Sequence, residues 1–258
     1  MQHLCHTLDD GGFLVYSWFE AMHTRMDIIL WDKEISGLEQ VSESILEEIQ
    51  RIEAMGSCFL SDSEISAINA SPVGVPVKVS DELFQLLERC LDYNISTGGY
   101  FDVAAMQAHA GLTLNQKILL QEGNSVTRLF DEVRINLSGY LKGYALDRAV
   151  GIVRQSSVRN GLLNFGNSSV AAFGNHPNGK GWPVRTAEGE EEYMLQDECL
   201  TTSGNNTGQR VHIINPKTGF LLEGKGMVSV VTTTAQEGEV LSTVKFIKEH
   251  KTNKYEDK

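Results

Sequence analysis

The sequence predicts an α+β fold in which mostly antiparallel sheets pack against helices. Two observations support it. Short apolar runs bounded by turn residues indicate strands along most of the chain, and amphipathic segments at helical spacing interrupt them without a regular strand and helix alternation. Neither an internal repeat nor a low-complexity block occurs in the 258 residues. With a hydrophobic composition of 41%, the chain can bury a large core in one domain or two closely packed parts.

The N-terminal half is expected to begin with a strand and two helices. Met26–Trp31 ("MDIILW") has the composition of a strand. A first helix follows this strand. A second helix starts with Ser80 as N-cap, carries two acidic residues in its first turn and ends at Gly98. The region from Tyr100 to about Arg128 is weakly periodic, which leaves open whether it contains a short helix. The apolar residues at helical spacing in the first helix are Val41, Ile45, Ile49 and Ile52.

The C-terminal half is expected to alternate strands, turns and two further helices. One helix runs to about Gln155, and the last spans about Ala235 to Lys248. The expected strands lie at 133–137, 161–165, 170–174, within 184–204, and at 211–214 and 227–233. The apolar face of the last helix comprises Val240, Leu241, Val244 and Ile247.

Composition disfavours several classes of protein. The net charge of −12, with no lysine and arginine stripe, argues against nucleic-acid binding. Four scattered cysteines lack the spacing of a zinc site or a disulfide framework. No segment approaches the roughly 20 apolar residues of a membrane span. The first residues show neither a signal peptide nor a lipoprotein signal, so we expect a cytoplasmic protein.

Two glycine-containing segments have the composition of anion sites. Gly174–Lys180 ("GNHPNGK") matches G-x-x-x-x-G-K but lacks the following Ser or Thr, so a hairpin turn is the better interpretation. The segment 135–150 ("INLSGYLKGYALDRAV") places Lys142 early in a helix that follows a strand and a glycine turn, where an anion can bind. On this feature alone, a packed turn with a surface lysine is favoured about two to one.

Three polar features near the C-terminus each have a structural alternative. His212 is expected at the start of a strand, where histidines are more often structural than catalytic. Residues 201–206 ("TTSGNN") form a hydroxyl-rich turn that either binds phosphate or closes a loop. Glu239 and Thr243 share one face of the last helix, where their hard oxygens suit Mg²⁺ unless both simply face solvent.

Together these segments resemble the FAD:protein FMN transferases of the ApbE type. The resemblance covers nearly the whole chain from residue 19, and the order of its motifs makes chance improbable. The motifs are "FEAMHTRMDI" (19–28), "DSEISAIN" (62–69), "STGGYFDVAAM" (96–106), "INLSGYLKGYALDRAV" (135–150), "LLNFGNSS" (162–169), "LTTSG" (200–204), "HIINPKTG" (212–219) and "AQEGEVLST" (235–243).

The resemblance implies a two-lobed domain over residues 19–248, with FAD in a cleft between the lobes, an extension at 1–18 and a polar tail at 249–258. Such enzymes split FAD, move FMN to a threonine or serine hydroxyl of a partner flavoprotein and release AMP. The resemblance implies Mg²⁺ ligands at Gly139, Glu239 and Thr243 and a base at His212. Implied flavin contacts are Met22, Asp102, Asn136, Lys142 and Ile213, and the implied supporting residues are Thr202, Ser203 and Gly204.

The sequence departs from the family pattern at four positions. Asn136 and Asn215 stand where aspartates are usual, Glu239 replaces the aspartate of the metal helix, and His23 replaces a glycine. Asparagine keeps an acceptor but cannot ionise, whereas glutamate keeps the charge and adds a methylene. The alternatives are therefore an FAD-binding protein with impaired transfer, an FAD pyrophosphatase, or a structural paralogue that binds no flavin.

Overall fold

The computed structural model describes residues 1–9, 11–186, 191–205 and 212–250. The chain divides into two compact units. The first unit comprises Met1–Glu53, Leu141–Thr202 and Ser229–Glu239, and the second comprises Ala54–Tyr140, Ser203–Val228 and Val240–Lys258. The helices of the described part are α1 (Ile35–Gly56), α2 (Glu64–Ala70), α3 (Asp81–Ser96), α4 (Ser138–Gln155) and α5 (Ala235–Glu249). The strands are β1 (Gln2–Thr7), β2 (Phe13–Ala21), β3 (Thr24–Asp32), β4 (Val77–Lys78), β5 (Ile118–Gln121), β6 (Ser125–Arg128), β7 (Asn160–Phe165), β8 (Ser169–Phe173), β9 (Trp182–Arg185), β10 (Glu192–Leu195), β11 (Glu198–Asn205) and β12 (Gly226–Thr232).

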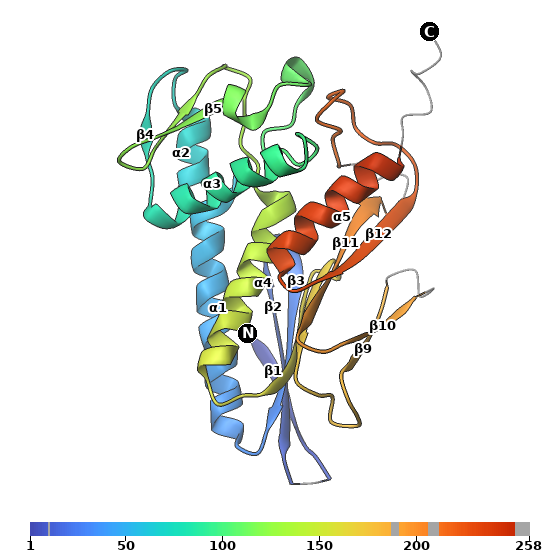
Figure 1. The fold of residues 1–258 in the computed structure, drawn as a ribbon. Coiled ribbons are helices and arrows are strands. Elements are labelled where there is room, and N and C mark those ends of the chain that lie inside the picture. Colours follow the sequence, from blue (N-terminus) through green and yellow to red (C-terminus); the bar gives the residue numbers. More distant parts are fainter. Residues whose placement is uncertain (10, 187–190, 206–211, 251–258) are drawn as a thin grey trace. The chain divides into compact units, whose positions relative to one another are not determined.

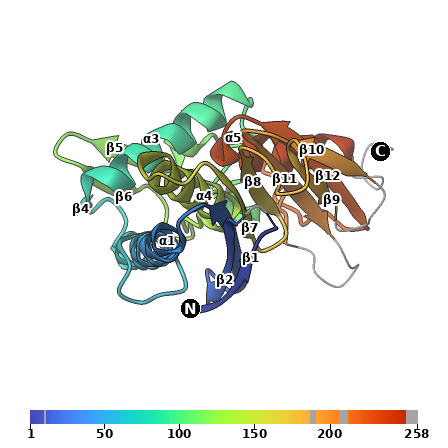
Figure 2. The same ribbon diagram turned by 90° about the horizontal axis from the view of Figure 1, so that it is seen from below.

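A seven-stranded sheet has the order β1-β2-β3-β7-β8-β11-β12, and its strands can be found in Figures 1 and 2 together. The pairs from β1 to β11 are all antiparallel, which confirms the predicted α+β class with mostly antiparallel strands. Residues 1–18, expected as an extension, supply β1 and most of β2, and β2 pairs with β3 along its whole length. They are therefore part of the sheet. The two lobes and the cleft implied by the resemblance remain a prediction.

The core of the first unit lies on both faces of this sheet. Helices α1 and α4 cover one face, and the β9–β10 hairpin lies on the other (Figures 1 and 2). In β3, Met26, Ile28 and Leu30 are fully buried, while Ile29 and Trp31 pack against the cluster under the hairpin. Because both faces are covered, β3 has an almost continuous apolar sequence. The members of that cluster are Val170, Ala172, Trp182, Leu195 and Leu200.

The second unit holds α2, α3 and a three-stranded sheet of order β4-β6-β5. Helix α3 confirms the predicted helix and its cap, since Ser80 Oγ accepts a hydrogen bond from Leu83 N at 3.3 Å. The segment left open between Tyr100 and Arg128 contains two short 3₁₀ turns and strands β5 and β6. An apolar cluster packs the C-terminal part of α5 against β12 and the segment 213–222 of the same unit. Its members are Ile213, Leu222, Val228, Phe246 and Ile247.

The prediction of a strand at 133–137 is wrong. The segment is extended and buries alternate residues (Val133, Ile135, Leu137), but it belongs to no sheet. The side chain of Asn69 takes the place of a neighbouring strand. Its Nδ2 donates to Ile135 O at 2.8 Å, and its Oδ1 accepts from Ile135 N at 2.8 Å. The alternation of apolar and polar residues shows which side chains are buried. It does not show whether a neighbouring strand or a side chain forms the hydrogen bonds to the backbone of the segment.

Three further expectations near the C-terminus need correction. The turn predicted at 201–206 is the end of β11 as far as Asn205, and 206–211 lie outside the described residues. His212 precedes no strand, since its segment makes only an isolated bridge between Ile214 and Leu221. Leu241 is 42% exposed, because the buried stripe of α5 follows residues 240, 244 and 247.

Gly174–Lys180 is a turn, as predicted. His176 and Gly179 form an isolated bridge, and strand β9 follows directly. No helix amides are therefore available here to bind phosphate. None of the described helices is long and apolar enough to cross a membrane.

Candidate functional site

In the first unit, several predicted site residues gather at one end of the sheet. Met22 lies in the two-residue turn between β2 and β3, and the β7–β8 turn lies beside it, because Gly166 N donates to Arg25 O at 2.9 Å. Thr202 is tied to the same turn by a hydrogen bond from its N–H to Ser168 O at 2.7 Å. The antiparallel order of the strands thus places two sequence-distant turns and the end of β11 together.

Lys142 and Glu239 bond to neighbouring serines where this β7–β8 turn meets β8. Lys142 Nζ donates to Ser168 Oγ, and Ser169 Oγ donates to Glu239 Oε1 at 2.5 Å. The two serine oxygens are 3.4 Å apart. Lys142 therefore turns inward and is not the surface lysine of the alternative interpretation. Glu239, only 4% exposed, is likewise not solvent-facing.

The electrostatics of Glu239 show a carboxylate held in a poorly solvated place. Burial raises the pKa of the Glu239 carboxyl, and the charge of Lys142 and the hydrogen bond from Ser169 act against this increase. Asp147 adds a smaller repulsion that also raises the pKa. A carboxylate in such a place favours a nearby cation.

Helix α5 reaches this position by close packing against α4 and β11. A Cβ added to Gly143 would lie 2.6 Å from Ala235 O and 2.6 Å from Glu239 Cγ, and one added to Gly238 would lie 2.3 Å from Thr201 Oγ1. Only glycine fits at either position. The Asp147 carboxylate caps the helix by accepting from Ala235 N at 2.7 Å and from Gln236 N at 3.0 Å.

In the second unit, the structure brings Ser203 and Thr243 together. Ser203 Oγ lies 3.1 Å from Thr243 Oγ1 and 2.8 Å from Ser242 Oγ, within hydrogen-bond distance of both. Gly204 is fixed by the neighbouring strand, since an added Cβ would lie 2.2 Å from Gly226 O. Ser203 and Gly204 belong to the end of β11, so the supporting turn predicted from the sequence is instead a strand.

The start of α4, also in the second unit, exposes Gly139 and caps the helix with Asn136. Asn136 Oδ1 accepts from Ser138 N at 2.9 Å and from Ser138 Oγ at 2.6 Å. A Cβ added to Gly139 would meet nothing within 4 Å, so packing does not require glycine there. Its neighbourhood is therefore open to a ligand.

Asp102 forms a buried ion pair that sequence reasoning missed. Its Oδ2 lies 2.6 Å from Lys117 Nζ, and both side chains are fully buried. Its Oδ1 accepts from Ala104 N at 2.8 Å. Because the side chain is buried and paired, any contact of Asp102 with a flavin would have to be made by its main chain. Lys117 lies in the segment without periodicity, and nothing in the sequence pairs it with Asp102.

His212 and Ile213 lie next to the 215–220 turn. The His212 side chain is exposed, whereas Ile213 is buried in the apolar cluster against α5 and its carbonyl accepts from Leu222 N at 2.9 Å. Asn215 holds the turn by accepting from Lys217 N at 3.0 Å with its Oδ1. His212 is thus an exposed residue beside a fixed turn.

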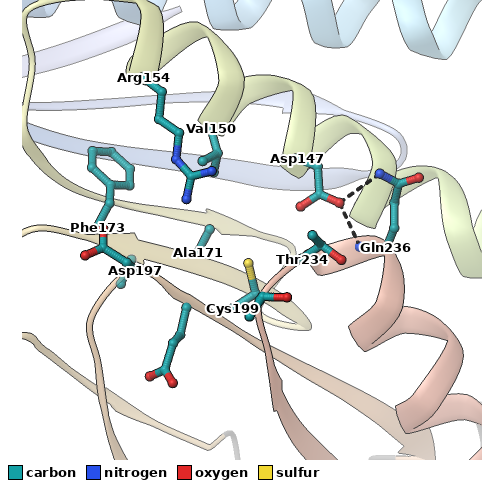
Figure 3. Close-up of a pocket in the computed structure, with 12 residues that line it drawn as sticks. Asp147, Val150, Arg154, Ala171, Phe173, Asp197, Cys199, Thr234 and Gln236 are labelled. Atoms are coloured by element: carbon teal, nitrogen blue, oxygen red, sulfur yellow. Dashed lines mark hydrogen bonds between the residues drawn. The ribbon is translucent and has the colours of Figure 1, made fainter.

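A separate cavity of 130 Å³ lies in the first unit between α4, β8, β11 and the start of α5. Figure 3 shows Arg154 pointing into it and Asp147 bonded to Gln236 at its rim. None of the predicted site residues lines this cavity. It is smaller than the roughly 300–1,000 Å³ of typical ligand pockets, so it does not suit a dinucleotide.

The proposed metal ligands fit Mg²⁺ by the chemistry of their donors. Glu239 offers a carboxylate, Thr243 a hydroxyl and Gly139 a carbonyl, all hard oxygens. Within the described residues, no group of three or more His, Cys, Asp or Glu side chains could hold a metal. A site with one carboxylate suits Mg²⁺ that takes further oxygens from substrate phosphates.

Comparison with known proteins identifies the family. The FAD:protein FMN transferase of Klebsiella pneumoniae is 26% identical to this chain, over 90% of this chain and 82% of the relative. That of Haemophilus influenzae is 24% identical, over 93% and 75%.

Solved structures share the fold. The ApbE protein of Thermotoga maritima has a TM-score of 0.78 at 23% identity, covering 93% of this chain and 88% of that one. The apo flavinyl transferase ApbE of Pseudomonas stutzeri has a TM-score of 0.78 at 17% identity, covering 90% and 84%. The ApbE family pattern itself matches residues 22–255, and the chain therefore belongs to the ApbE family.

Proposed function

We propose that this protein transfers FMN from FAD to a threonine or serine hydroxyl of a partner flavoprotein and releases AMP, with Mg²⁺ bound. The observation that carries the proposal is the arrangement of Lys142 and Glu239 on adjacent serines, Ser168 at the end of the β7–β8 turn and Ser169 at the start of β8. A buried carboxylate and an inward lysine, both within a family of flavin transferases, suit a site that handles a charged pyrophosphate.

Each proposed residue has a distinct task. Glu239, Thr243 and the Gly139 carbonyl would hold Mg²⁺, which supplies neutralisation of pyrophosphate charge when bound. Lys142 would orient the flavin or its phosphate. Met22, Asp102, Asn136 and Ile213 are proposed as further flavin contacts, supported by Thr202, Ser203 and Gly204.

The proposed chemistry balances without a further reactant. The acceptor hydroxyl oxygen attacks the phosphorus of the FMN half of FAD, and the bond from that phosphorus to the AMP oxygen breaks. His212, whose imidazole is exposed, would take the hydroxyl proton. AMP leaves with the bond electrons, and FMN remains esterified to the acceptor.

The departures at Asn136 and Asn215 are compatible with this proposal. Each uses its side-chain oxygen as a local acceptor, Asn136 at the start of α4 and Asn215 in its turn. An aspartate makes the same hydrogen bonds, so these positions keep their structural task although they lose a negative charge.

The test measures two products. The purified protein is incubated with FAD, Mg²⁺ and a cytoplasmic extract, AMP is quantified, and covalently attached flavin is detected by fluorescence after denaturing electrophoresis. We expect both AMP and a fluorescent acceptor band, and we expect Glu239→Gln to abolish them. A protein that binds FAD but yields neither product with any divalent metal would refute the proposal.

The alternatives predict other combinations of the same readouts. AMP without labelled acceptor indicates an FAD pyrophosphatase. Tight FAD binding without AMP indicates an impaired FAD-binding protein, and turnover restored by Glu239→Asp would then assign the defect to the longer side chain. The absence of any flavin binding indicates a structural paralogue. We propose a cytoplasmic acceptor, which is why the extract is taken from that compartment.

A further inference from the structure

We propose that Ser169 is a positioning residue that fixes the carboxylate of Glu239 for metal binding. The inference rests on the proposed function and deepens it, because it assigns a task to a residue outside the expected ligand set. Ser169 begins β8, directly after the β7–β8 turn. It does not itself contact the substrate in this proposal.

The first argument is the contact itself. Ser169 is fully buried, and its Oγ donates to Glu239 Oε1 at 2.5 Å. A hydroxyl donor to a carboxylate gives one of the stronger hydrogen bonds in proteins. It occupies part of the acceptor capacity of one oxygen and orients the whole carboxylate plane.

The second argument is that the stem of Glu239 packs closely against α4. A Cβ on Gly143 would lie 2.6 Å from Glu239 Cγ, so the side chain passes directly over α4 at this glycine. With the stem held against Gly143 and one oxygen held by Ser169, few rotamers remain. This restriction suits a glutamate, because its extra methylene otherwise gives the carboxylate more freedom than an aspartate has.

The third argument is that a serine hydroxyl is unfavourable in this buried strand unless it has a hydrogen-bond partner such as Glu239. All five residues of β8 are buried, and those after Ser169 are Val170, Ala171, Ala172 and Phe173. A hydroxyl in such a strand is costly unless it forms a hydrogen bond. Ser169 also lies 3.4 Å from Ser168 Oγ, which accepts from Lys142 Nζ. The serine pair thus holds both charged residues in one arrangement.

The test compares metal binding with flavin binding. Mn²⁺ alone serves as the metal probe and is titrated by electron paramagnetic resonance, while metal-free FAD binding is followed by flavin fluorescence. We expect Ser169→Ala to weaken Mn²⁺ binding about 10- to 100-fold, as is typical when a hydrogen bond to a metal ligand is lost. FAD affinity should change less than twofold.

Ser17→Ala is the matched control. Ser17 is also a fully buried serine of the first unit, in β2, but its Oγ has no hydrogen-bond partner among the described residues. Removing that oxygen should leave Mn²⁺ binding unchanged. In a Glu239→Gln background, Ser169→Ala should add no further loss, because the carboxylate that it orients is gone. This double variant separates positioning from a general effect on folding.

Two outcomes overturn the inference in distinguishable ways. If the unmodified protein binds Mn²⁺ and Ser169→Ala binds it equally well, or if the two variants weaken binding additively, Ser169 does not position Glu239. If the unmodified protein binds no Mn²⁺ at any tested concentration, the proposed metal set fails and the inference fails with it. Equal loss of Mn²⁺ and FAD binding in Ser169→Ala would also count against positioning, since it indicates a structural defect.

Discussion

Replacing Gly143 by alanine tests whether close packing between α4 and α5 sets the position of Glu239. The new Cβ would lie 2.6 Å from Ala235 O and 2.9 Å from Ala235 C, both main-chain atoms that cannot rotate away. Such overpacking costs about 1–3 kcal/mol. Against it stands the usual gain of about 0.5–1 kcal/mol when alanine replaces a glycine inside a helix.

Gly151→Ala provides the comparison, because Gly151 lies in the same helix and an added Cβ there meets nothing within 4 Å. Both variants gain the same stability from replacing a helical glycine by alanine. The difference between their unfolding free energies therefore measures the cost of the clash at Gly143. We expect Gly151→Ala to be slightly more stable than the unmodified protein, and Gly143→Ala to be about 1–3 kcal/mol less stable than Gly151→Ala. Urea unfolding at pH 7 measures both.

The same pair of variants extends to function. Glu239 Cγ is among the atoms that the new methyl would contact, so FMN transfer should fall in Gly143→Ala and remain in Gly151→Ala. The reasoning is refuted if both alanine variants have equal unfolding free energies. It is also refuted if Gly143→Ala loses stability while its Mn²⁺ affinity stays unchanged.

Three further predictions concern stability. Lys117→Met should cost about 3–5 kcal/mol because it leaves the Asp102 carboxylate buried and unpaired, and adding Asp102→Leu should restore part of that loss in thermal unfolding. The Arg51 guanidinium is the main cause that lowers the pKa of Glu48 from 4.5 to about 2, so Glu48 stabilises the fold above pH 4.5 and the contribution is lost toward pH 2. Glu48→Gln should therefore destabilise by about 1 kcal/mol at pH 7 and progressively less in acid. His23→Gly should stabilise by about 1 kcal/mol in urea unfolding, since His23 has φ of 59°.

Much of the fold was predictable because local signals and tertiary burial agree. Helix α3 has its cap, its acidic first turn and its stop in sequence, and the structure has the same helix. Where the local signal and the structure disagree, a contact with a residue distant in sequence determines the structure. The strand expected at 133–137 lacks a neighbouring strand because the Asn69 side chain, more than 60 residues away, bonds to its backbone. No local pattern records such a partner.

The candidate site was predictable mainly through the family pattern, and its supporting contacts were not. Glu239 and Thr243 are recognisable as an oxygen pair on a helix, but burial of Glu239 and its bond to Ser169 depend on how α5 packs. The two adjacent hydroxyls in "GNSS" were a visible signal that sequence reasoning left unused. The Asp102 and Lys117 pair left no signal, since the residues are 15 apart in a segment without periodicity.

The division of the chain into two interleaved units has a consequence for protein engineering. Each unit is assembled from three separate segments, so the chain passes between them five times, at 53/54, 140/141, 202/203, 228/229 and 239/240. No single truncation can therefore yield either unit by itself. Gene fragments cut at one point would give polypeptides that lack parts of both cores, so a split or permuted version has to keep all six segments present together.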